Sequence, residues 1–359
     1  MSTTALNQFQ SPNKTATTSD SVARTKILLL GQRRSGKTSI QQVLFNNVLP
    51  KQTFYIEPTT RIVKHVYERG PASTVIPLEI WDCPGNITLE MLNAPLSSFS
   101  SIIFVIDIQD SYQQPIARLL SFFIAAYQES PGTSLEVFVH KSDALTEDYK
   151  IENFRHIQQR FWDELLDMSP DYEQMLVNFY LTSVYDHSIH DGFSRVLHRL
   201  IESLPFLEEL LNVYCSNSQA SKAFLFDMKT RLYVATDASP VDTGTHNLCC
   251  DYVKTLNVFG SLYRSASASP SRLRTLTPAS GTTRPKLSFY PCAALSLAPP
   301  AQGTTLTYHL ITPQLALLSL LPTTVHEGRR GLVEYNVVFF REGVQDIVDV
   351  EKDARTGEL

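Results

Sequence analysis

The sequence predicts an α/β domain with a mostly parallel, doubly wound sheet, followed by a smaller α+β domain. Strand-like apolar runs alternate with helical patterns from residue 26 to 204, and this alternation is typical of a parallel sheet with helices on both faces. The pattern changes after Pro205. A length of 359 residues also exceeds what a single core usually covers, so two domains are expected.

The first domain is expected to contain five strands and four helices. Strands are predicted at 26–30, 75–81, 101–107, 135–139 and 177–182, where short apolar runs occur. Helices are predicted after Gly36 and at 112–129, 148–167 and 188–204. The last of these has apolar residues at the i, i+3, i+4 spacing of an amphipathic helix.

The second domain is expected to be a small sheet with flanking helices. We predict a helix at 206–214, two strands within 223–237 around a turn at Lys229 and Thr230, a helix at about 245–263, strands within 287–321, and a helix at 329–349. The predicted organisation is a disordered tail at 1–24, a first domain at 25–205, a second at 206–352 and a C-terminal tail at 353–359. The Ser/Thr/Pro/Arg-rich stretch at about 265–286 is expected to be a disordered insertion.

Composition excludes several classes of partner. The net charge is -5 and the pI is about 6.0, so nucleic acid is not an expected partner. Five cysteines without C-x-x-C spacing indicate neither a disulfide framework nor a zinc site. The longest apolar tract, 315–322, is far shorter than the about 18 residues of a transmembrane helix. We therefore expect a cytoplasmic protein that reaches a membrane only through other proteins.

The stretch GQRRSGKT at 31–38 fits the phosphate-binding pattern G-x-x-x-x-G-K-[ST] between a predicted strand and a predicted helix. In this setting backbone N–H groups and the helix N-terminus face phosphates. Lys37 would reach the outer phosphates, and the hydroxyl of Thr38 would ligate Mg²⁺. The pattern alone leaves kinases, ATPases and GTPases open.

Two further motifs follow predicted strands. In DCPG, Asp82 lies where a carboxylate can support a magnesium ion without ligating it directly, and the N–H of Gly85 could contact a terminal phosphate. HKSD at 140–143 resembles the guanine-reading [N/T]KxD box of GTPases. Its Asp143 would accept from the guanine N1–H and amine, and the stem of Lys141 would cover the ring. His140 stands where asparagine is usual.

The segment LTSVYD at 181–186 ends another predicted strand, where the backbone of Ser183 and Val184 could contact the guanine carbonyl. In the adjoining DHSIHD run, His187, His190 and Asp191 could form a metal site. A helix N-cap at Asp186 or Ser188 with exposed histidines is the favoured interpretation.

With these motifs in order, the sequence resembles the Rag family of GTPases, in particular its RagC/RagD branch and the fungal Gtr counterpart. The resemblance rests on GQRRSGKTSIQQVLF, IWDCPG, VFVHKSDAL, FYLTSVYDHSIHDGFSRV, LLNVYCSNSQASKAFLFD and VATDASPVD. It implies a P-loop small-GTPase domain followed by a roadblock (longin-like) domain. Arg33, Arg34 and His140 are shared with that branch.

The resemblance implies GTP/GDP and Mg²⁺ as cofactors, and it assigns Thr59 as the magnesium-sensing threonine of the first switch, with Thr53 and Glu57 near the nucleotide. Together the motifs and the resemblance predict these nucleotide-binding residues: Arg34, Ser35, Gly36, Lys37, Thr38, Ser39, Thr53, Glu57, Thr59, Gly85, His140, Lys141, Asp143, Ser183 and Val184. The residues expected at the metal are Thr38, Thr59 and Asp82.

The resemblance also implies an obligate heterodimer with a RagA/B-type subunit through the second domain. The pair would sit on the lysosome or vacuole through a lipidated scaffold complex and relay amino-acid sufficiency to target-of-rapamycin complex 1. Asn86 follows DCPG where glutamine is usual, so slow hydrolysis that depends on a GTPase-activating protein is expected. A nucleotide-bound pseudo-GTPase scaffold and an Arf-like membrane-traffic GTPase are the alternatives.

Overall fold

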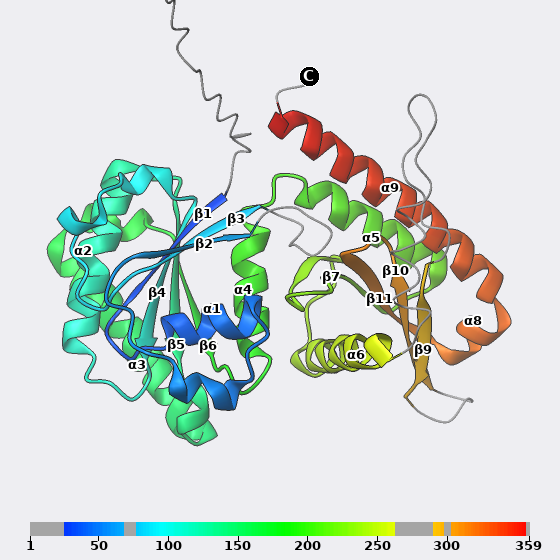
Figure 1. Ribbon diagram of the computed structural model, residues 1–359, viewed down its shortest axis with the longest axis horizontal. Coiled ribbons are helices and arrows are strands. Elements are labelled where there is room, and N and C mark those ends of the chain that lie inside the picture. Colours follow the sequence, from blue (N-terminus) through cyan, green and yellow to red (C-terminus); the bar gives the residue numbers. More distant parts are fainter. Residues whose placement is uncertain (1–24, 68–76, 263–289, 298–302, 357–359) are drawn as a thin grey trace, which may run out of the picture.

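The computed structural model describes residues 25–67, 77–262, 290–297 and 303–356. The predicted tail at 1–24 and the predicted insertion at 265–286 lie outside these ranges. Two sheets, each with its own helices, follow one another along the chain, and Figure 1 shows them side by side. No helix in the described part is both long enough and apolar enough to cross a membrane.

The first sheet has six strands in the order β2-β3-β1-β4-β5-β6. β2 runs antiparallel to β3, and the other neighbours are parallel. The strands are β1 (Thr25–Gly31), β2 (Val63–Tyr67), β3 (Leu78–Asp82), β4 (Ser101–Asp107), β5 (Ser134–His140) and β6 (Val177–Thr182).

Helices cover both faces of this sheet, which confirms the predicted doubly wound fold. The helices are α1 (Lys37–Phe45), α2 (Gln113–Glu129), α3 (Glu147–Met168) and α4 (Ser188–His198), joined by short 3₁₀ turns such as η1 (Pro50–Tyr55) and η4 (Ser142–Ala144). Along β1, Ile27 and Leu29 pack in one core with α1 and α4, whereas Leu28 and Leu30 pack in a second core with α2 and α3.

Two elements differ from the sequence-based expectation. β2 was not predicted, because it is an edge strand in which Lys64 and Val66 are exposed and no apolar run marks it. The helix expected at 188–204 ends at His198, and α5 (Leu204–Ser218) begins anew. Pro205 is in the first turn of α5, where a missing N–H costs no hydrogen bond.

The second sheet has five antiparallel strands in the order β8-β7-β11-β10-β9. They are β7 (Lys222–Asp227), β8 (Tyr233–Thr236), β9 (Cys292–Ser296), β10 (Thr304–Leu310) and β11 (Leu315–Pro322). α6 (Thr243–Leu262) covers one face, and α5 and α9 (Arg330–Thr356) cover the other (Figure 1). This arrangement confirms the α+β fold with a longin/roadblock-like sheet.

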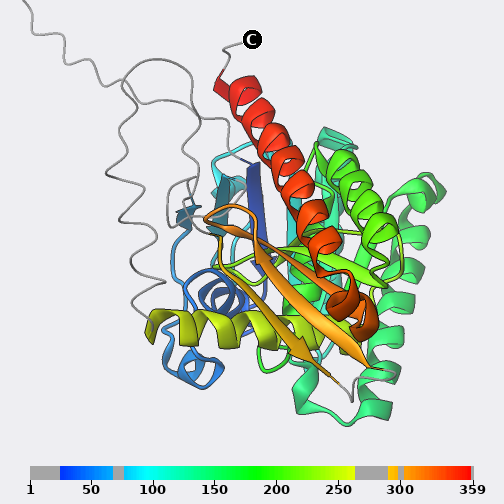
Figure 2. The same cartoon turned by 90° about the vertical axis from the view of Figure 1, so that its right-hand side faces the viewer.

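The pair α5 and α9 packs closely. A Cβ atom on Gly343 of α9 would lie 2.9 Å from Cδ1 of Leu210 on α5, so a larger residue there would require the side chain of Leu210 to move. Figure 2 shows α9 crossing the sheet diagonally beside α5. The short helix α8 (Thr323–Gly328) precedes α9, and α9 runs beyond residue 352, where the sequence analysis placed a tail.

One apolar cluster joins the two sheets. It combines Ile27 and Ile103 of the first sheet with Leu211 of α5 and Leu225 and Leu317 of the second sheet. Because both sheets contribute side chains to this cluster, the two halves share a core.

Polar contacts surround the shared core. The N–H of Tyr233 donates to Oγ of Ser194 at 3.0 Å, and its hydroxyl donates to Oδ1 of Asp191 at 2.7 Å. Nδ2 of Asn47 donates to the carbonyl of Lys229 at 3.2 Å. The hydrogen bonds and the shared cluster fix the second sheet against α1 and α4.

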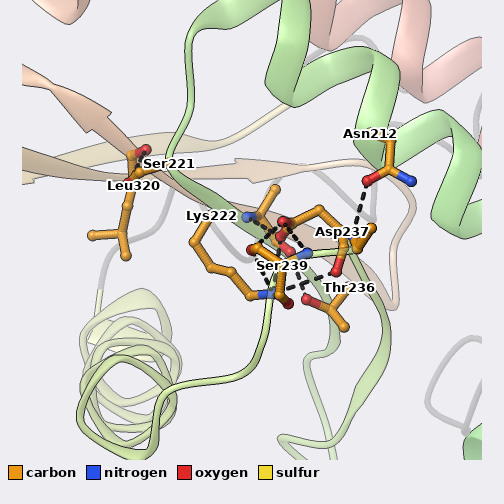
Figure 3. A network of polar contacts seen from close by, with 9 residues as sticks. Asn212, Ser221, Lys222, Thr236, Asp237, Ser239 and Leu320 are labelled. Carbon is orange, nitrogen blue, oxygen red and sulfur yellow. Dashed lines mark hydrogen bonds and ion pairs between the residues drawn. The ribbon is translucent and has the colours of Figure 1, made fainter.

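A buried ion pair fastens the start of β7. Nζ of Lys222 lies 3.1 Å from Oδ1 of Asp237 and also donates to the carbonyl of Ser239 at 2.5 Å. Both side chains of the pair are about 7% exposed. Asp237 also accepts from the N–H of Ala223 on the strand at 2.9 Å, and Oδ1 of Asn212 on α5 accepts from the N–H of Ala238 at 2.8 Å. Figure 3 shows Lys222, Asp237 and Ser239 gathered together. These contacts fix the loop that connects β8 to α6 to the start of β7.

Candidate nucleotide-binding site

A cleft of about 650 Å³ opens where the parallel strands β1, β3, β4, β5 and β6 end. Ligands of open α/β sheets bind at this edge. Most residues predicted from sequence line it, together with several that were not predicted. The lining residues are Arg33, Arg34, Gly36, Lys37, Thr38, Ser39, Thr53, Phe54, Ile56, Glu57, Pro58, Thr59, Cys83, Gly85, Gln109, His140, Lys141, Asp143, Ala144, Val184 and Tyr185.

The loop between β1 and α1 has the backbone that a phosphate cradle requires. Gly36 has φ of 103°, and Arg34 has φ of 67°, so both lie in the left-handed region that turns successive N–H groups toward one side. A Cβ atom on Gly36 would lie 2.5 Å from Cδ2 of His140. Glycine is therefore required here both by conformation and by space.

The ammonium group of Lys37 is held over this loop. Nζ donates to the carbonyls of Gly31 and Gln32, both at 2.8 Å, and the residue is 6% exposed. Burial lowers the pKa of Lys37 to about 8, and the nearby carboxylate of Asp82 partly opposes that shift. An anion placed in the loop would favour the charged form of this lysine.

Three oxygen-bearing side chains meet beside Lys37. Oγ1 of Thr38 donates to Oδ2 of Asp82 at 2.6 Å and lies 2.8 Å from Oγ1 of Thr59, which itself donates to Oδ2 of Asp82 at 3.1 Å. Asp82 is 1% exposed, and its Oδ1 has no partner in the described part of the chain. The segment of Thr59 is thereby tied to the helix and strand that flank the phosphate loop.

The other end of the cleft contains the HKSD motif. Nζ of Lys141 forms an ion pair with Oδ2 of Asp107 at 2.6 Å, which holds the lysine at the end of β4. Oδ1 of Asp143 accepts from Oγ of Ser183 at 2.5 Å, and that same Oγ accepts from the N–H of Tyr185 at 3.0 Å. These contacts join the loops after β5 and β6 into one wall.

His140 is a buried part of this wall. It is 1% exposed, and Nδ1 lies 3.0 Å from Oγ1 of Thr182. Burial, followed by the charge of Lys141, lowers the pKa of His140 to about 3, so the imidazole is neutral at physiological pH. The ring packs against the backbone of Gly36, a contact that sequence reasoning did not anticipate.

Four predicted residues do not line the cleft. Ser35, Asp82 and Ser183 are buried behind it, whereas Asn86 is exposed on the loop after β3. The carbonyls on both sides of Asn86, those of Gly85 and Ile87, accept from the guanidinium of Arg118 on α2. No local pattern indicates this contact, because Arg118 lies 32 positions away from Asn86 on an amphipathic helix.

The DHSIHD run does not form a metal cluster: no group of three or more His, Cys, Asp or Glu suited to a metal occurs in the described ranges. Oδ1 of Asp186 accepts from the N–H of Ser188 at 2.8 Å at the start of α4, as a cap would. The expectation of exposed histidines is wrong for His190, which is 3% exposed beneath the second domain.

Comparison with known proteins identifies the family. Residues 26–253 match the model of the Gtr1/RagA G protein conserved region. The chain is 38% identical over 336 residues to the Ras-related GTP-binding protein C of Homo sapiens, which covers 91% of this chain and 78% of the relative. It is 36% identical to the GTP-binding protein gtr2 of Schizosaccharomyces pombe, over 90% of this chain and 97% of that one.

A more distant relative is the Ras-related GTP-binding protein A of Dictyostelium discoideum, at 24% identity over 70% of this chain and 81% of the relative. The relatives therefore include both types of subunit, and identity is greater to the C and gtr2 type. The matches span the phosphate loop, the guanine-box motif and most of the second sheet, and with the two-domain fold they show that the chain belongs to the Rag/Gtr family of GTPases.

Proposed function

We propose that this chain is the nucleotide-switch subunit of a Rag-type heterodimer, which binds GTP and GDP with Mg²⁺ in the cleft. The observation that supports this most directly is the contact of Thr59 with Thr38 and Asp82. It joins a segment outside the sheet to the phosphate loop, so whatever occupies the loop affects the position of that segment. Such a coupling is the usual basis of a GTPase switch.

Each end of the cleft suits one part of the nucleotide. Backbone N–H groups of residues 34–39 and the ammonium of Lys37 suit the phosphates, with Thr53 and Glu57 on the outer wall. Asp143 offers a carboxylate that matches the N1–H and amine of guanine, which adenine lacks. The segment of Ser183 and Val184 closes the base end.

The oxygen cluster of Thr38, Thr59 and Asp82 fits a magnesium ion. Hydroxyl and carboxylate oxygens are the donors that Mg²⁺ prefers, and Oδ1 of Asp82 is buried without a partner in the described part. Thr38 and Thr59 would hold the ion, and Asp82 would orient them. When bound, the ion neutralises charge on the phosphates.

Hydrolysis without a partner protein is proposed to be slow. Asn86 carries an amide on a stem one methylene shorter than that of glutamine, and it is exposed outside the cleft wall. The Arg118 contacts hold its backbone in that position. Steady-state hydrolysis of excess GTP by the purified protein, with and without an activating protein, tests this. Multiple turnovers per minute by the protein alone would contradict it.

The second sheet is proposed to pair with a RagA/B-type subunit. β9 is an edge strand with β10 as its one neighbour in the described sheet, and Leu295 on it is 40% exposed. At the end of α6, Phe259 is 52% exposed. An edge strand with exposed apolar side chains is a suitable interface for a second, similar sheet.

The pairing is tested by expressing the chain with and without a RagA/B-type subunit and measuring the molar mass of the purified species. A 1:1 complex is expected, and Ala294→Pro on β9 should weaken it because proline breaks edge pairing. Thr146→Pro, at an exposed position before α3 with φ of -70°, is the matched control away from the second sheet. A monomer under all conditions would contradict the proposal.

The signalling role is also proposed: the pair relays amino-acid sufficiency to target-of-rapamycin complex 1 at the vacuole or lysosome, held there by a scaffold complex. Family membership supports it. The test is imaging and co-purification of the tagged chain from amino-acid-fed and starved cells, compared with the Lys37→Ala variant. Nucleotide binding that persists without any effect on this signalling would favour a scaffold function instead.

A further inference from the structure

A second cleft, of about 830 Å³, lies between the two domains. Its walls come from α1 and η1, the segment between β6 and α4, the turn between β7 and β8, α6, and the turn between β10 and β11. The residues that line it are Val43, Asn47, Val48, Leu49, Pro50, Val184, Tyr185, Asp186, His187, His190, Met228, Lys229, Arg231, Lys254, Asn257, Val258, Pro313 and Gln314.

The charges in this cleft are mostly positive. Lys229, Arg231 and Lys254 line it, and Asp186 is the one acidic residue among the lining side chains. Oδ1 of Asp186 is already engaged by the N–H and hydroxyl of Ser188. The cleft therefore has more positive charge than its own walls neutralise, although the chain as a whole is acidic.

Arg231 is the cation best placed to hold an anion. It is partly buried in the β7–β8 turn with φ of 59°, and its guanidinium forms no ion pair or hydrogen bond with the described part of the chain. Burial lowers the pKa of Arg231, and the negative charge of Asp251 opposes this shift without a hydrogen bond to the guanidinium. A buried guanidinium without a hydrogen-bonded carboxylate is costly, and an anionic ligand would remove that cost.

His190 provides a second, independent indication of a ligand. It is 3% exposed, it lines the cleft, and neither ring nitrogen has a partner in the described residues. Burial keeps the pKa of His190 well below 6.5, and the charges of Arg231 and, to a smaller degree, Lys254 act in the same direction. The neutral ring has one donor and one acceptor nitrogen, and both are buried without a hydrogen bond from the described residues.

The remaining wall is apolar. Val48 contributes from the loop between α1 and η1, and Pro50 from the start of η1. Met228, Val258 and Pro313 contribute from the second domain. Pockets for small molecules typically combine such an apolar wall with a few convergent polar groups. The cleft volume is within the range of about 300–1,000 Å³ found for such sites.

We propose that the interdomain cleft binds a small organic anion, with a phosphate or carboxylate group on Arg231, Lys254 and His190 and an apolar body against Val48 and Met228. This site is separate from the nucleotide cleft: none of the phosphate-loop residues lines it. Val184 and Tyr185 are the residues common to both walls. The proposal does not depend on the proposed switch function.

The test is calorimetric titration of the full chain, purified with any accompanying subunit and saturated with GDP so that the nucleotide cleft is filled. The probes are hexyl phosphate, hexanoate and the neutral hexanol, which share one apolar body. Saturable binding of an anionic probe at one site per chain is expected, with hexanol at least roughly tenfold weaker. Hexyl phosphate and hexanoate together decide which anionic group the site prefers.

Arg231→Gln keeps a long polar side chain without the charge and should weaken the anionic probe roughly tenfold or more. Arg155→Gln, on the exposed face of α3, is the matched control and should leave binding unchanged. If Arg231→Gln does not fold, as judged by its melting curve and GDP content, Lys254→Gln on the exposed side of α6 replaces it with a smaller expected loss. No saturable binding, equal binding of hexanol, or equal effects of the cleft and control variants would overturn the proposal.

Discussion

The hydroxyl of Thr38 at the start of α1 donates to Oδ2 of Asp82 at the end of β3, at 2.6 Å. The two residues are 44 positions apart in sequence, and they meet because β1 and β3 are parallel neighbours whose carboxyl ends coincide. Thr59 reaches the same carboxylate oxygen. The phosphate loop, the end of β3 and the segment that contains Thr59 are therefore held together at the carboxylate of Asp82.

Asp82→Asn should weaken the retention of GDP in the presence of Mg²⁺. The amide removes the negative charge that holds the two threonine hydroxyls, so the proposed ion is oriented less well. A faster release of fluorescent GDP is expected, by roughly 10- to 100-fold, with a reduced further effect of EDTA. Asp171→Asn, on an exposed turn after α3, is the control. Unchanged sensitivity to EDTA would argue against a role of Asp82 at the metal.

Asp143→Ala should weaken GDP binding and reduce discrimination against ADP. A hydrogen bond to a charged group contributes about 1.5–3 kcal/mol, which corresponds to roughly 10- to 100-fold in affinity. Ser183→Ala removes the hydroxyl that donates to Asp143 without removing the carboxylate, so a smaller loss is expected. Competition binding with GDP and ADP measures both quantities. Equal losses for the two nucleotides would mean that Asp143 does not read the base.

Gly36→Ala should abolish nucleotide binding. The residue has φ of 103°, and the added methyl would lie 2.5 Å from the ring of His140, which is itself buried. The matched control is Gly132→Ala, where a Cβ atom meets nothing within 4 Å. GDP content after purification and the melting temperature separate loss of binding from loss of folding. Normal GDP content in Gly36→Ala would contradict the steric argument.

Lys222→Met should destabilise the chain by about 3–5 kcal/mol, because it leaves the carboxylate of Asp237 buried without its cation. Glu334→Gln breaks the exposed Arg330–Glu334 pair on α9, with side chains 65% and 55% exposed, and should cost less than about 1 kcal/mol. Denaturant unfolding of GDP-bound protein gives both values. Equal effects would show that burial does not set the strength of these pairs.

The same pair predicts an acid-dependent loss of stability. Burial alone would raise the pKa of Asp237, but the hydrogen bonds from Ala223 and Ser239 and the contact with Lys222 outweigh it, so the net shift is downward from 3.8. A carboxyl whose native pKa is lowered stabilises the fold fully above its unfolded pKa. This contribution is lost as the pH falls below about 3.8 toward the native value. Asp237→Asn should flatten the stability profile in that window, as measured by denaturant unfolding at stepwise lower pH.

Elements with a clear local pattern could be predicted from the sequence, and those without one could not. β1 and β4 were predicted because each is a continuous apolar run, and the motif residues at their ends fell into one cleft because parallel strands end at a common edge. β2 has no such run. The burial of His190 was not predictable, because the helix that covers it, α6, follows more than fifty residues later in the sequence.

The contacts that arrange the site were also beyond local patterns. The ion pair of Lys141 with Asp107 and the contacts of Arg118 with the loop after β3 depend on how strands and helices meet in space. Asp107 could have been predicted to lie at the site, because it ends a buried strand at the same edge of the sheet as the motifs. Arg118 carried no such signal.

The apolar cluster that runs from Ile27 and Ile103 through Leu211 to Leu225 and Leu317 has a thermodynamic consequence. Side chains that share a core lose their packing together, so the two sheets are expected to melt in one cooperative transition rather than two. Free energy gained when a nucleotide binds at the edge of the first sheet then counts toward the melting of the second as well. The occupied cleft thus protects a sheet with which the nucleotide has no contact.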